Sequence, residues 1–324
     1  MQGRVLILLA TYNGEKYIKE QIDSIRAQTY KNWCLCISDD GSSDNTLSII
    51  HEIAADENRI LPVLNDNKKH GACTNFYHLL RFAKRHIDEY DYFCLCDQDD
   101  IWEHNKIEKQ INSARDLSCS VLIYSNLRIM DETGKLHEKM SDIQQIKLDN
   151  PANIFFNQIF VWGNTVMINK KMLVETSFPD DLGNGLSHDH YLAFQAASCG
   201  RVFYIEEPLV RYRRSSYNVS DMPHKYNIPT AIKKLIKLRH ELINSHAQNY
   251  NNILYFIKHC TSNNALLEDI EKCYTYGGVE ALKVIRKYNV RVGSNEFNKI
   301  ARELILLTGL YKKSNYFCSG NITT

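Results

Sequence analysis

Three carboxylates lie together at one point of the chain, directly after an apolar segment. The apolar segment is Tyr92–Cys96, and Asp97, Asp99 and Asp100 follow it at once. Like-charged groups this close raise one another's pKa values unless a cation or several hydrogen-bond donors compensate them. Hard divalent ions such as Mg²⁺ and Mn²⁺ prefer oxygen ligands of this kind. We therefore predict a cation site that neutralises the charge of a departing diphosphate.

The acidic residues have an alternative role at the start of a helix. A helix N-terminus favours negative charge, and the run Lys106–Ile111, with Trp102 before it, fits a helix. One acid is enough for a cap, whereas this site has three, so we favour the cation site. We expect the capping role to fall to Asp100.

A second acidic segment is Ser38–Asp44, which reads Ser-Asp-Asp-Gly-Ser-Ser-Asp. These residue types dominate tight turns and helix caps, so a turn alone would account for them. With an apolar strand before the segment and a helix after it, Asp39 and Asp40 can also accept hydrogen bonds from a nucleobase and a ribose. There is no Gly-rich dinucleotide or P-loop pattern, which argues against those two classes of nucleotide-binding protein.

A third acidic segment, His188-Asp189-His190, opens an apolar helix. Asp189 in the same crevice would take a proton from an incoming hydroxyl. Two alternatives stay open on the residues alone: a capping acid between two surface histidines, and a His-x-His zinc pair without a third ligand at familiar spacing.

The elements that must position these residues alternate between apolar strands and amphipathic helices. We expect helices at Tyr17–Gln28 and Asn45–Ala55, and the expected strands are Val5–Ala10, Trp33–Ser38, Ile60–Leu64, Tyr92–Cys96 and Val121–Tyr124. This alternation predicts an α/β fold with a mostly parallel, doubly wound sheet. Ligands of such sheets lie beyond the carboxyl ends of the strands, where all the acidic segments should converge.

Composition bounds the protein class. The chain has 324 residues, 44% hydrophobic and 24% charged, and a formal net charge of +1, so it is globular and has no global field that attracts nucleic acid. The apolar run at the N-terminus is too short to span a membrane. The pairs Cys34/Cys36 and Cys94/Cys96 lie in apolar strands and predict buried free thiols in a reducing compartment.

The second half of the chain has a different pattern of predicted helices and strands. We expect a strand region at Ile159–Ile168, interrupted at Gly163, and a helix from His188 that stops at Gly200 before the strand Arg201–Ile205. Beyond about residue 222 the segments are helical. We therefore predict a catalytic domain at residues 1–222 and a helical region at residues 223–324.

Taken in order, the motifs resemble those of family 2 glycosyltransferases over roughly residues 4 to 220. The motifs are Thr11-Tyr12-Asn13-Gly14, Ser38–Asp44, Asp97–Trp102, His188-Asp189 and Pro208–Arg213. The resemblance implies a GT-A-type, Rossmann-like fold. Within the family, the Asp-Gln-Asp-Asp-Ile-Trp form followed by His-Asp is most similar to bacterial rhamnosyltransferases that build cell-surface polysaccharides.

The resemblance also implies roles for individual residues. Nucleotide-sugar binding falls to Thr11, Tyr12, Asp39, Asp40 and Asp97, to which we add Asn13 from the first turn and Arg213 as a partner of the diphosphate charge. Asp97 and Asp99 would hold Mg²⁺ or Mn²⁺, and Asp189 would be the general base of an inverting reaction. One departure is Ser215, which stands where relatives often have a metal-binding histidine.

The resemblance further implies a donor, an acceptor and a location. The donor would be a nucleotide-activated hexose such as dTDP-rhamnose, or alternatively UDP-galactose, UDP-glucose or UDP-GlcNAc. The acceptor would be a glycan or a polyprenyl-diphosphate-linked sugar, and the enzyme would be cytoplasmic, with peripheral contact at the inner face of the cell membrane. A basic amphipathic helix at Ala231–Ile243 fits such contact, although a packed helix explains it as well.

Two other function classes stay open on the sequence. A nucleotidyltransferase also combines an α/β sheet with acidic metal ligands, but it would usually carry a Gly-rich basic phosphate loop after the first strand, unlike Thr11–Glu15. A non-catalytic carbohydrate-binding protein would keep the fold without turnover.

Overall fold

The computed structural model describes residues 3–65, 69–114, 118–143, 150–156, 161–179, 186–214, 239–260, 262, 264–290 and 296–317. The chain divides into two compact units. The sheet unit is Met1–Asp142 with Val161–Asp221, and the helical unit is Ile143–Phe160 with Met222–Thr324. The functional roles assigned above to residues 1–222 and 223–324 stay predictions.

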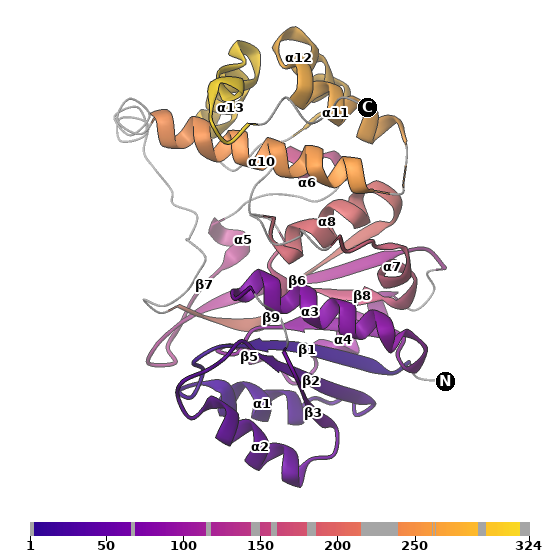
Figure 1. Ribbon diagram of the computed structural model, residues 1–324, viewed down its shortest axis with the longest axis vertical. Coiled ribbons are helices and arrows are strands. Elements are labelled where there is room, and N and C mark those ends of the chain that lie inside the picture. The colour runs from indigo at the N-terminus through magenta and orange to yellow at the C-terminus, as the bar shows by residue number, and fades with distance from the viewer. Residues whose placement is uncertain are drawn as a thin grey trace. The chain divides into compact units, whose positions relative to one another are not determined.

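Four parallel strands form the first half of the sheet (Figure 1). They are β1 (Val5–Thr11), β2 (Trp33–Asp39), β3 (Ile60–Val63) and β4 (Tyr92–Cys96), in the order β3-β2-β1-β4. Every residue of β1 is buried, as a central strand covered on both faces requires. These strands confirm the predicted ones, and their carboxyl ends lie at one edge of the sheet.

The second half of the sheet is mixed. The short strand β8 (Met167–Asn169) lies antiparallel between β4 and β6 (Val121–Asp131), so β6 runs in the same direction as β4. Strand β9 (Arg201–Arg214) is parallel to β6, while β5 (Ile101–Trp102) and β7 (Leu136–Lys139) are antiparallel to β9 and β6. The sheet is therefore mostly parallel, as predicted.

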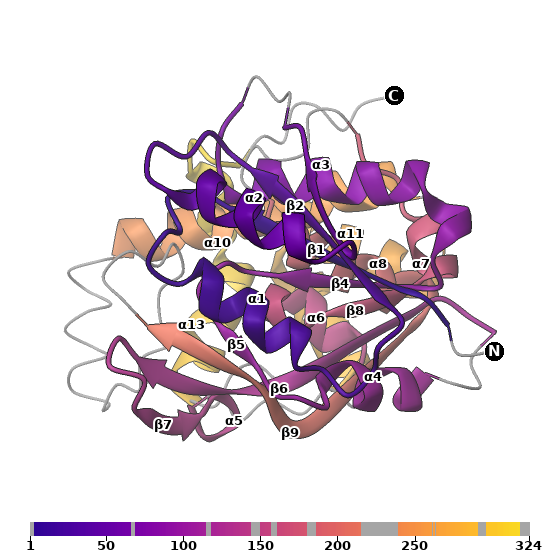
Figure 2. The same ribbon diagram turned by 90° about the horizontal axis from the view of Figure 1, so that it is seen from below.

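Helices cover both faces of this sheet, and α3 and α4 lie on opposite faces (Figure 2). The helices are α1 (Ile18–Arg26), α2 (Thr46–Asp56), α3 (Ala72–Arg85), η1 (Ile87–Glu89), α4 (Lys106–Ala114), α5 (Met140–Ile143), η2 (Gly163–Thr165), α7 (Lys170–Glu175) and α8 (His188–Cys199). Helices α1, α2, α4 and α8 confirm the predictions. The cysteines Cys34, Cys36, Cys94 and Cys96 are buried free thiols, also as predicted.

Helix α3 was not predicted, and the structure shows why. Its N-cap is Gly71, with φ +128° and no capping side-chain hydrogen bond, so the usual local start signal is missing. Its inner face is nevertheless apolar: Phe76, Leu79, Leu80 and Ala83 are buried. Burial of this face stabilises the helix where the sequence offers no local cap.

The residues after the acidic turn form a strand where a helix was expected. Ile101 pairs with Arg211 and Trp102 with Val210 in β5, and helix α4 begins only at Lys106. The prediction that Trp102 belongs to the helix was wrong, because pairing with a strand more than 100 residues later cannot be read from local spacing.

The helical unit contains only helices among its described residues. They are α6 (Ala152–Phe156), α10 (Arg239–His259), α11 (Ala265–Tyr276), α12 (Gly278–Lys287), α13 (Glu296–Thr308) and η3 (Leu310–Lys313). Three tyrosines form its core: the rings of Tyr250 and Tyr274 stack 4.3 Å apart, and Tyr311 meets Tyr250 edge-on at 5.0 Å. Most of the predicted amphipathic helix at 231–243 lies outside the described residues.

In the described ranges we find no helix long and apolar enough to cross a membrane.

Candidate active site

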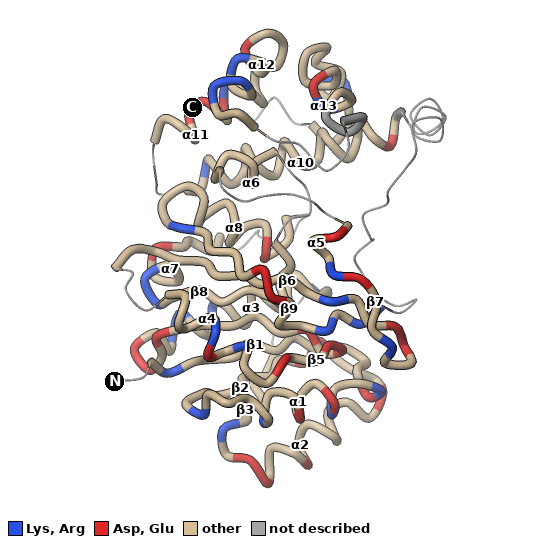
Figure 3. The backbone as a smooth tube through the Cα atoms, turned by 180° about the vertical axis from the view of Figure 1, so that it is seen from behind, with Lys and Arg blue, Asp and Glu red and all other residues tan. Residues whose placement is uncertain are grey.

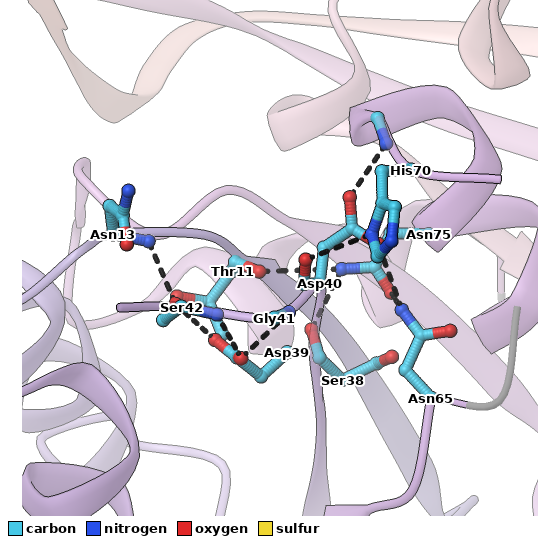
Figure 4. Close-up of polar contacts among 11 residues, drawn as sticks. Thr11, Asn13, Ser38, Asp39, Asp40, Gly41, Ser42, Asn65, His70 and Asn75 are labelled. Carbon is cyan, nitrogen blue, oxygen red and sulfur yellow. Dashed lines mark hydrogen bonds and ion pairs between the residues drawn. The ribbon is translucent and has the colours of Figure 1, made fainter. Parts of the chain in front are cut away.

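The loop after β1 is held in place by its neighbours. Thr11 is buried, while the Tyr12 side chain is 55% exposed. Asn13 adopts φ +48°, a left-handed conformation that asparagine tolerates better than most residues. Its backbone N–H donates to Ser42 Oγ at 2.8 Å (Figure 4), and its side-chain oxygen accepts from Ser43 N at 2.8 Å. The first two predicted segments therefore lie side by side.

The neighbouring carboxylates Asp39 and Asp40 serve different partners. Asp39 Oδ1 accepts from Gly41 N at 3.0 Å and Ser42 N at 2.8 Å, which closes the turn after β2. Asp40 is buried, and its Oδ2 accepts from Gly71 N at 2.6 Å, at the start of α3 (Figure 4). Asp40 thus supplies from a distance the cap that α3 lacks locally, and its charge suits the helix N-terminus.

Two amide side chains join these loops. Asn75 Nδ2 donates to Ser38 O at 2.8 Å from inside α3 (Figure 4). Gln98 Oε1 accepts from Thr11 Oγ1 at 2.6 Å and Tyr12 N at 2.8 Å, while Gln98 Nε2 donates to Tyr12 O at 3.0 Å. Neither amide was predicted to have a role. The position of Gln98 between the predicted metal ligands Asp97 and Asp99 could have indicated that it contributes to the site.

The acidic turn after β4 has strongly perturbed electrostatics. Burial, together with the charges of Asp99 and Asp189, raises the pKa of Asp97 to about 7. Burial also raises the pKa of Asp99, which Arg213 partly offsets, and it raises that of Asp100 well above its usual range. The carboxylates repel one another as expected from their spacing. A cation at Asp97 and Asp99 would relieve this repulsion.

Asp100 does not cap a helix, so that prediction was wrong. Its Oδ1 accepts from Arg213 N at 3.0 Å, and its Oδ2 accepts from Asn164 Nδ2. Asp100 is buried. It ties the acidic turn to β9 and to η2, because those two partners come from these elements.

Arg213 lies beneath the acidic turn and is only 3% exposed. Its Nε donates to Asp99 O at 2.8 Å, and its Nη2 forms an ion pair with Glu20. Its guanidinium carbon lies 4.2 Å from the ring centroid of Tyr17. Arg213 is thus a buried side chain that holds the backbone of the turn. Its predicted contact with the diphosphate stays a prediction.

Asp189 lies in the first turn of α8, close enough to Asp97 for their charges to interact. Burial raises its pKa, but His190, His188 and two hydrogen bonds outweigh burial, so the pKa lies below its usual value. Its Oδ1 accepts from His190 N at 2.8 Å. Asp189 is therefore ionised at neutral pH, where Asp97 is about half protonated when no cation is bound. Two nearby carboxyl groups with separated pKa values suit different chemical tasks.

The dipeptide Gly163-Asn164 touches both halves of the centre. Asn164 bonds to Asp100, as described above. A Cβ atom at Gly163 would lie 2.9 Å from His188 Nε2 and 3.5 Å from Asp189 Cβ, so only glycine lets η2 approach α8 this closely. From the sequence, this dipeptide was predicted only to interrupt a strand.

Metal ligands are only partly accounted for. Among the described residues no group of three or more histidine, cysteine, aspartate or glutamate side chains is placed to hold a metal ion. Asp97 and Asp99 supply two oxygen ligands with raised pKa values, which fits a hard divalent cation. Ser215, which stands at the expected histidine position, lies outside the described residues.

Comparison with known proteins bears on both the family and the fold. The sequence model of the family described as "Glycosyl transferase family 2" matches residues 6–176. A dTDP-rhamnosyl transferase, RfbG of Shigella flexneri, is 33% identical over 222 residues, covering 65% of this chain and 72% of that protein. The Escherichia coli protein WfgD, a UDP-Glc:alpha-D-GlcNAc-diphosphoundecaprenol beta-1,3-glucosyltransferase, is 30% identical over 179 residues, covering 54% and 64%.

Two solved structures share the fold. Staphylococcus aureus TarS 1-349 in complex with UDP-GlcNAc has a TM-score of 0.57 at 15% identity, covering 95% of this chain and 81% of that one. The mannosyltransferase PcManGT from Pyrobaculum calidifontis, in complex with GDP-Man and Mn²⁺, has a TM-score of 0.53 at 17% identity, covering 98% and 84%. Both agree with the predicted GT-A-type fold.

Proposed function

The chain belongs to glycosyltransferase family 2, and we propose that it is an inverting, metal-dependent hexosyltransferase of cell-surface polysaccharide synthesis. One observation carries the proposal. An ionised Asp189 lies within electrostatic reach of Asp97, whose pKa is raised, at the carboxyl edge of the sheet. That edge is where α/β sheets bind nucleotides and where a base and a cation site must meet for glycosyl transfer.

In this proposal Asp189 takes the proton of the acceptor hydroxyl. Its lowered pKa keeps it ionised at neutral pH, so it is ready to accept that proton. The hydroxyl oxygen then attacks the anomeric carbon from the face opposite the diphosphate, through an oxocarbenium-like transition state. The configuration at that carbon is inverted, and no covalent sugar-enzyme intermediate forms.

Asp97 and Asp99 would hold Mg²⁺ or Mn²⁺. When bound, the cation would neutralise charge on the leaving diphosphate. The chain itself fixes the geometry of both carboxylates, because Arg213 bonds to the backbone of Asp99 and Gln98 bonds to the β1 loop. The Mn²⁺ in the PcManGT structure supports a divalent cation in this fold.

Nucleotide recognition would fall to the loops after β1 and β2. Tyr12 offers an exposed ring, and Thr11, Asn13 and Asp39 surround the same turn. Asp40 would contribute indirectly, because its carboxylate is bonded to the start of α3. We propose that it positions the start of α3 beside the nucleotide site.

The donor that we favour is dTDP-rhamnose, because RfbG is 33% identical to this chain. The alternative is a UDP-sugar such as UDP-galactose, UDP-glucose or UDP-GlcNAc, and the names of WfgD and of the TarS complex support it. The acceptor would be a glycan or a polyprenyl-diphosphate-linked sugar. We place the reaction in the cytoplasm, at the inner face of the cell membrane.

A donor panel tests this proposal. Purified protein is given dTDP-rhamnose, UDP-galactose, UDP-glucose or UDP-GlcNAc with Mg²⁺ or Mn²⁺, and released dTDP or UDP is measured. We expect turnover with one donor, loss of transfer in Asp189→Asn with donor binding kept, and no change in Asp88→Asn, whose side chain is 92% exposed.

Several outcomes would count against it. No nucleotide release from any donor would contradict the transferase, and glycan binding without turnover would favour a binding protein. Release of inorganic diphosphate from a nucleoside triphosphate and a sugar phosphate would favour a nucleotidyltransferase. If Asp99→Ala abolished transfer while Asp189→Asn kept it, Asp189 would not be the base.

A further inference from the structure

Helix α13 presents an apolar stripe to solvent. Ile300, Leu304 and Leu307 recur at intervals of four and three residues and therefore share one face of the helix. Their exposed fractions are 54%, 53% and 41%, and Leu310 in η3 extends the stripe at 39%. Ile305 and Leu306, in contrast, are buried in the unit. The helix thus has two apolar faces, and the described residues cover only one of them.

The turn between α11 and α12 adds to this stripe. Lys312 Nζ donates to Tyr276 O at 2.8 Å, which brings the turn beside η3. A Cβ atom at Gly277 would lie 2.9 Å from the Tyr311 hydroxyl, so the two turns are in close contact. Tyr276 and Val279 in this turn are 66% and 63% exposed. We call Tyr276, Val279, Ile300, Leu304, Leu307 and Leu310 the C-terminal apolar surface.

Positive charge is concentrated around this surface. Among the described side chains of residues 278–317, five basic ones are exposed, Lys283, Arg286, Lys287, Lys312 and Lys313, against two glutamates, Glu280 and Glu303. Lys312 and Lys313 are exposed beside Leu310, and Lys283 and Arg286 are exposed on α12. Figure 3 shows the basic residues of α12 gathered along that helix. An apolar stripe with a basic border suits an acidic partner.

Charge and composition together distinguish between two possible binding partners of this surface, a second copy of the chain and a lipid bilayer. A second copy of the chain would bring the same positive charge against itself, which disfavours a symmetric dimer through this surface. An anionic lipid bilayer would instead attract the lysines and accept the leucines at its acyl boundary. Tyrosine and lysine are side chains that place an apolar body in the interface and a polar tip in water.

We propose that the C-terminal apolar surface docks on an anionic lipid bilayer. Helix α13 lies in the plane of the membrane, with Leu304 and Leu307 inserted and Lys312 and Lys313 at the headgroups. This inference rests on the proposed function in one respect: it names the surface that brings the transferase to a lipid-linked acceptor.

Vesicle co-sedimentation of the full chain tests the docking. We expect binding to vesicles of phosphatidylcholine with about a third phosphatidylglycerol, weak binding to phosphatidylcholine alone, and release by salt. The double variant Leu304→Gln/Leu307→Gln should lower the partition coefficient at least about tenfold. Lys312→Gln/Lys313→Gln should lower binding to anionic vesicles only, by about tenfold. The matched control, Val174→Gln on α7, is half exposed in the sheet unit and should bind as wild type.

The proposal is overturned if the wild-type chain ignores anionic vesicles, or if the leucine double variant binds them as well as wild type does. It is also overturned if light scattering finds a wild-type dimer that the leucine variant turns into a monomer, because the occupant is then a second copy. Nucleotide release from a water-soluble donor, measured without vesicles, should be unchanged in the leucine variant. Docking without turnover in wild type would count against the proposed function alone.

Discussion

Arg213 in the sheet unit and Arg302 in the helical unit are both buried, but their surroundings differ. Arg213 donates to the backbone of the acidic turn and forms an ion pair with Glu20. Arg302 lies in α13, and its Nε and Nη1 find no hydrogen-bond partner in the part of the chain that the structure describes. Burial lowers its pKa, while Tyr250 and Tyr274 act in the opposite direction.

The two arginines differ in how far their surroundings compensate a buried charge. Removing a charge from water is unfavourable unless partners compensate it. In the sheet unit Arg213 donates to the Asp99 carbonyl and pairs with Glu20, so its buried charge is compensated and it anchors the acidic turn of the candidate active site. In the helical unit the Nε and Nη1 atoms of Arg302 have no such partner among the described residues, so we expect its burial to add little to stability or to reduce it.

The two units also differ in their response to pH. Asp97 has a raised pKa and His246 a lowered one, about 7 and about 3. Folding of the sheet unit therefore favours protons on Asp97, while folding of the helical unit excludes them from His246. The stabilities of the two units should change in opposite directions with pH.

The largest expected effect is that of Arg213→Met. Loss of the guanidinium leaves the Asp99 carbonyl and Glu20 without their partner, and we expect stability to fall by about 3 kcal/mol. Nucleotide release should fall at least about a hundredfold, because the turn that carries Asp97 and Asp99 is no longer fixed. Urea unfolding and the donor assay measure both. Wild-type activity in Arg213→Met would contradict the conclusion that Arg213, unlike Arg302, holds a functional segment in place.

The second effect concerns Asp97 without a cation. Its pKa is about 7 in the folded protein and 3.8 ordinarily, so its contribution to stability is present at low pH and lost as pH rises through 7. Between pH 5 and pH 8 in a metal chelator we expect a loss of about 2 kcal/mol. Asp97→Asn should remove this slope. Hydrogen exchange of β4 reports on the sheet unit alone, and an unchanged slope in Asp97→Asn would refute the assignment.

The third effect has the opposite sign and belongs to His246. Burial, together with the charge of Arg302, lowers its pKa from 6.5 to about 3. Its contribution to stability is complete above pH 6.5 and is lost as pH falls toward 3, which amounts to about 2 kcal/mol at pH 5. His246→Phe keeps a ring beside Tyr250 and should abolish this acid sensitivity. Hydrogen exchange of α10 is the measurement, and equal acid sensitivity in the variant would contradict it.

The smallest effect is that of Arg302→Met. A buried guanidinium whose Nε and Nη1 have no hydrogen-bond partner among the described residues is replaced by an apolar side chain of similar length, so we expect stability to change by less than about 1 kcal/mol or to rise. The pKa of His246 should rise as well, because the neighbouring cation is gone. The measurement is the free energy of unfolding of Arg302→Met in urea, compared with that of Arg213→Met. A loss as large as that of Arg213→Met would show that Arg302 has a partner after all.

The sequence predicted what depends on local pattern. The strands β1, β2 and β4 and the acidic residues at their ends were read from apolar runs followed by polar motifs. It did not predict α3, because its cap comes from Asp40, more than 30 residues earlier. It also missed the role of Arg213, whose ion pair with Glu20 joins residues 193 positions apart. Contacts between residues so far apart in the chain form only when the sheet is complete, and they leave no periodic pattern in the sequence.

The close approach of Gly163-Asn164 to both Asp100 and Asp189 has a consequence for how this enzyme can change. Asn164 bonds to Asp100 and its neighbour Gly163 lies against His188 and Asp189, so we expect a shift of this dipeptide to affect the acidic turn and Asp189 together and the two regions to change together in evolution. Laboratory selections for a new donor should accordingly recover compensating pairs of mutations around this dipeptide. Libraries that vary the acidic turn or α8 alone should be depleted of active clones.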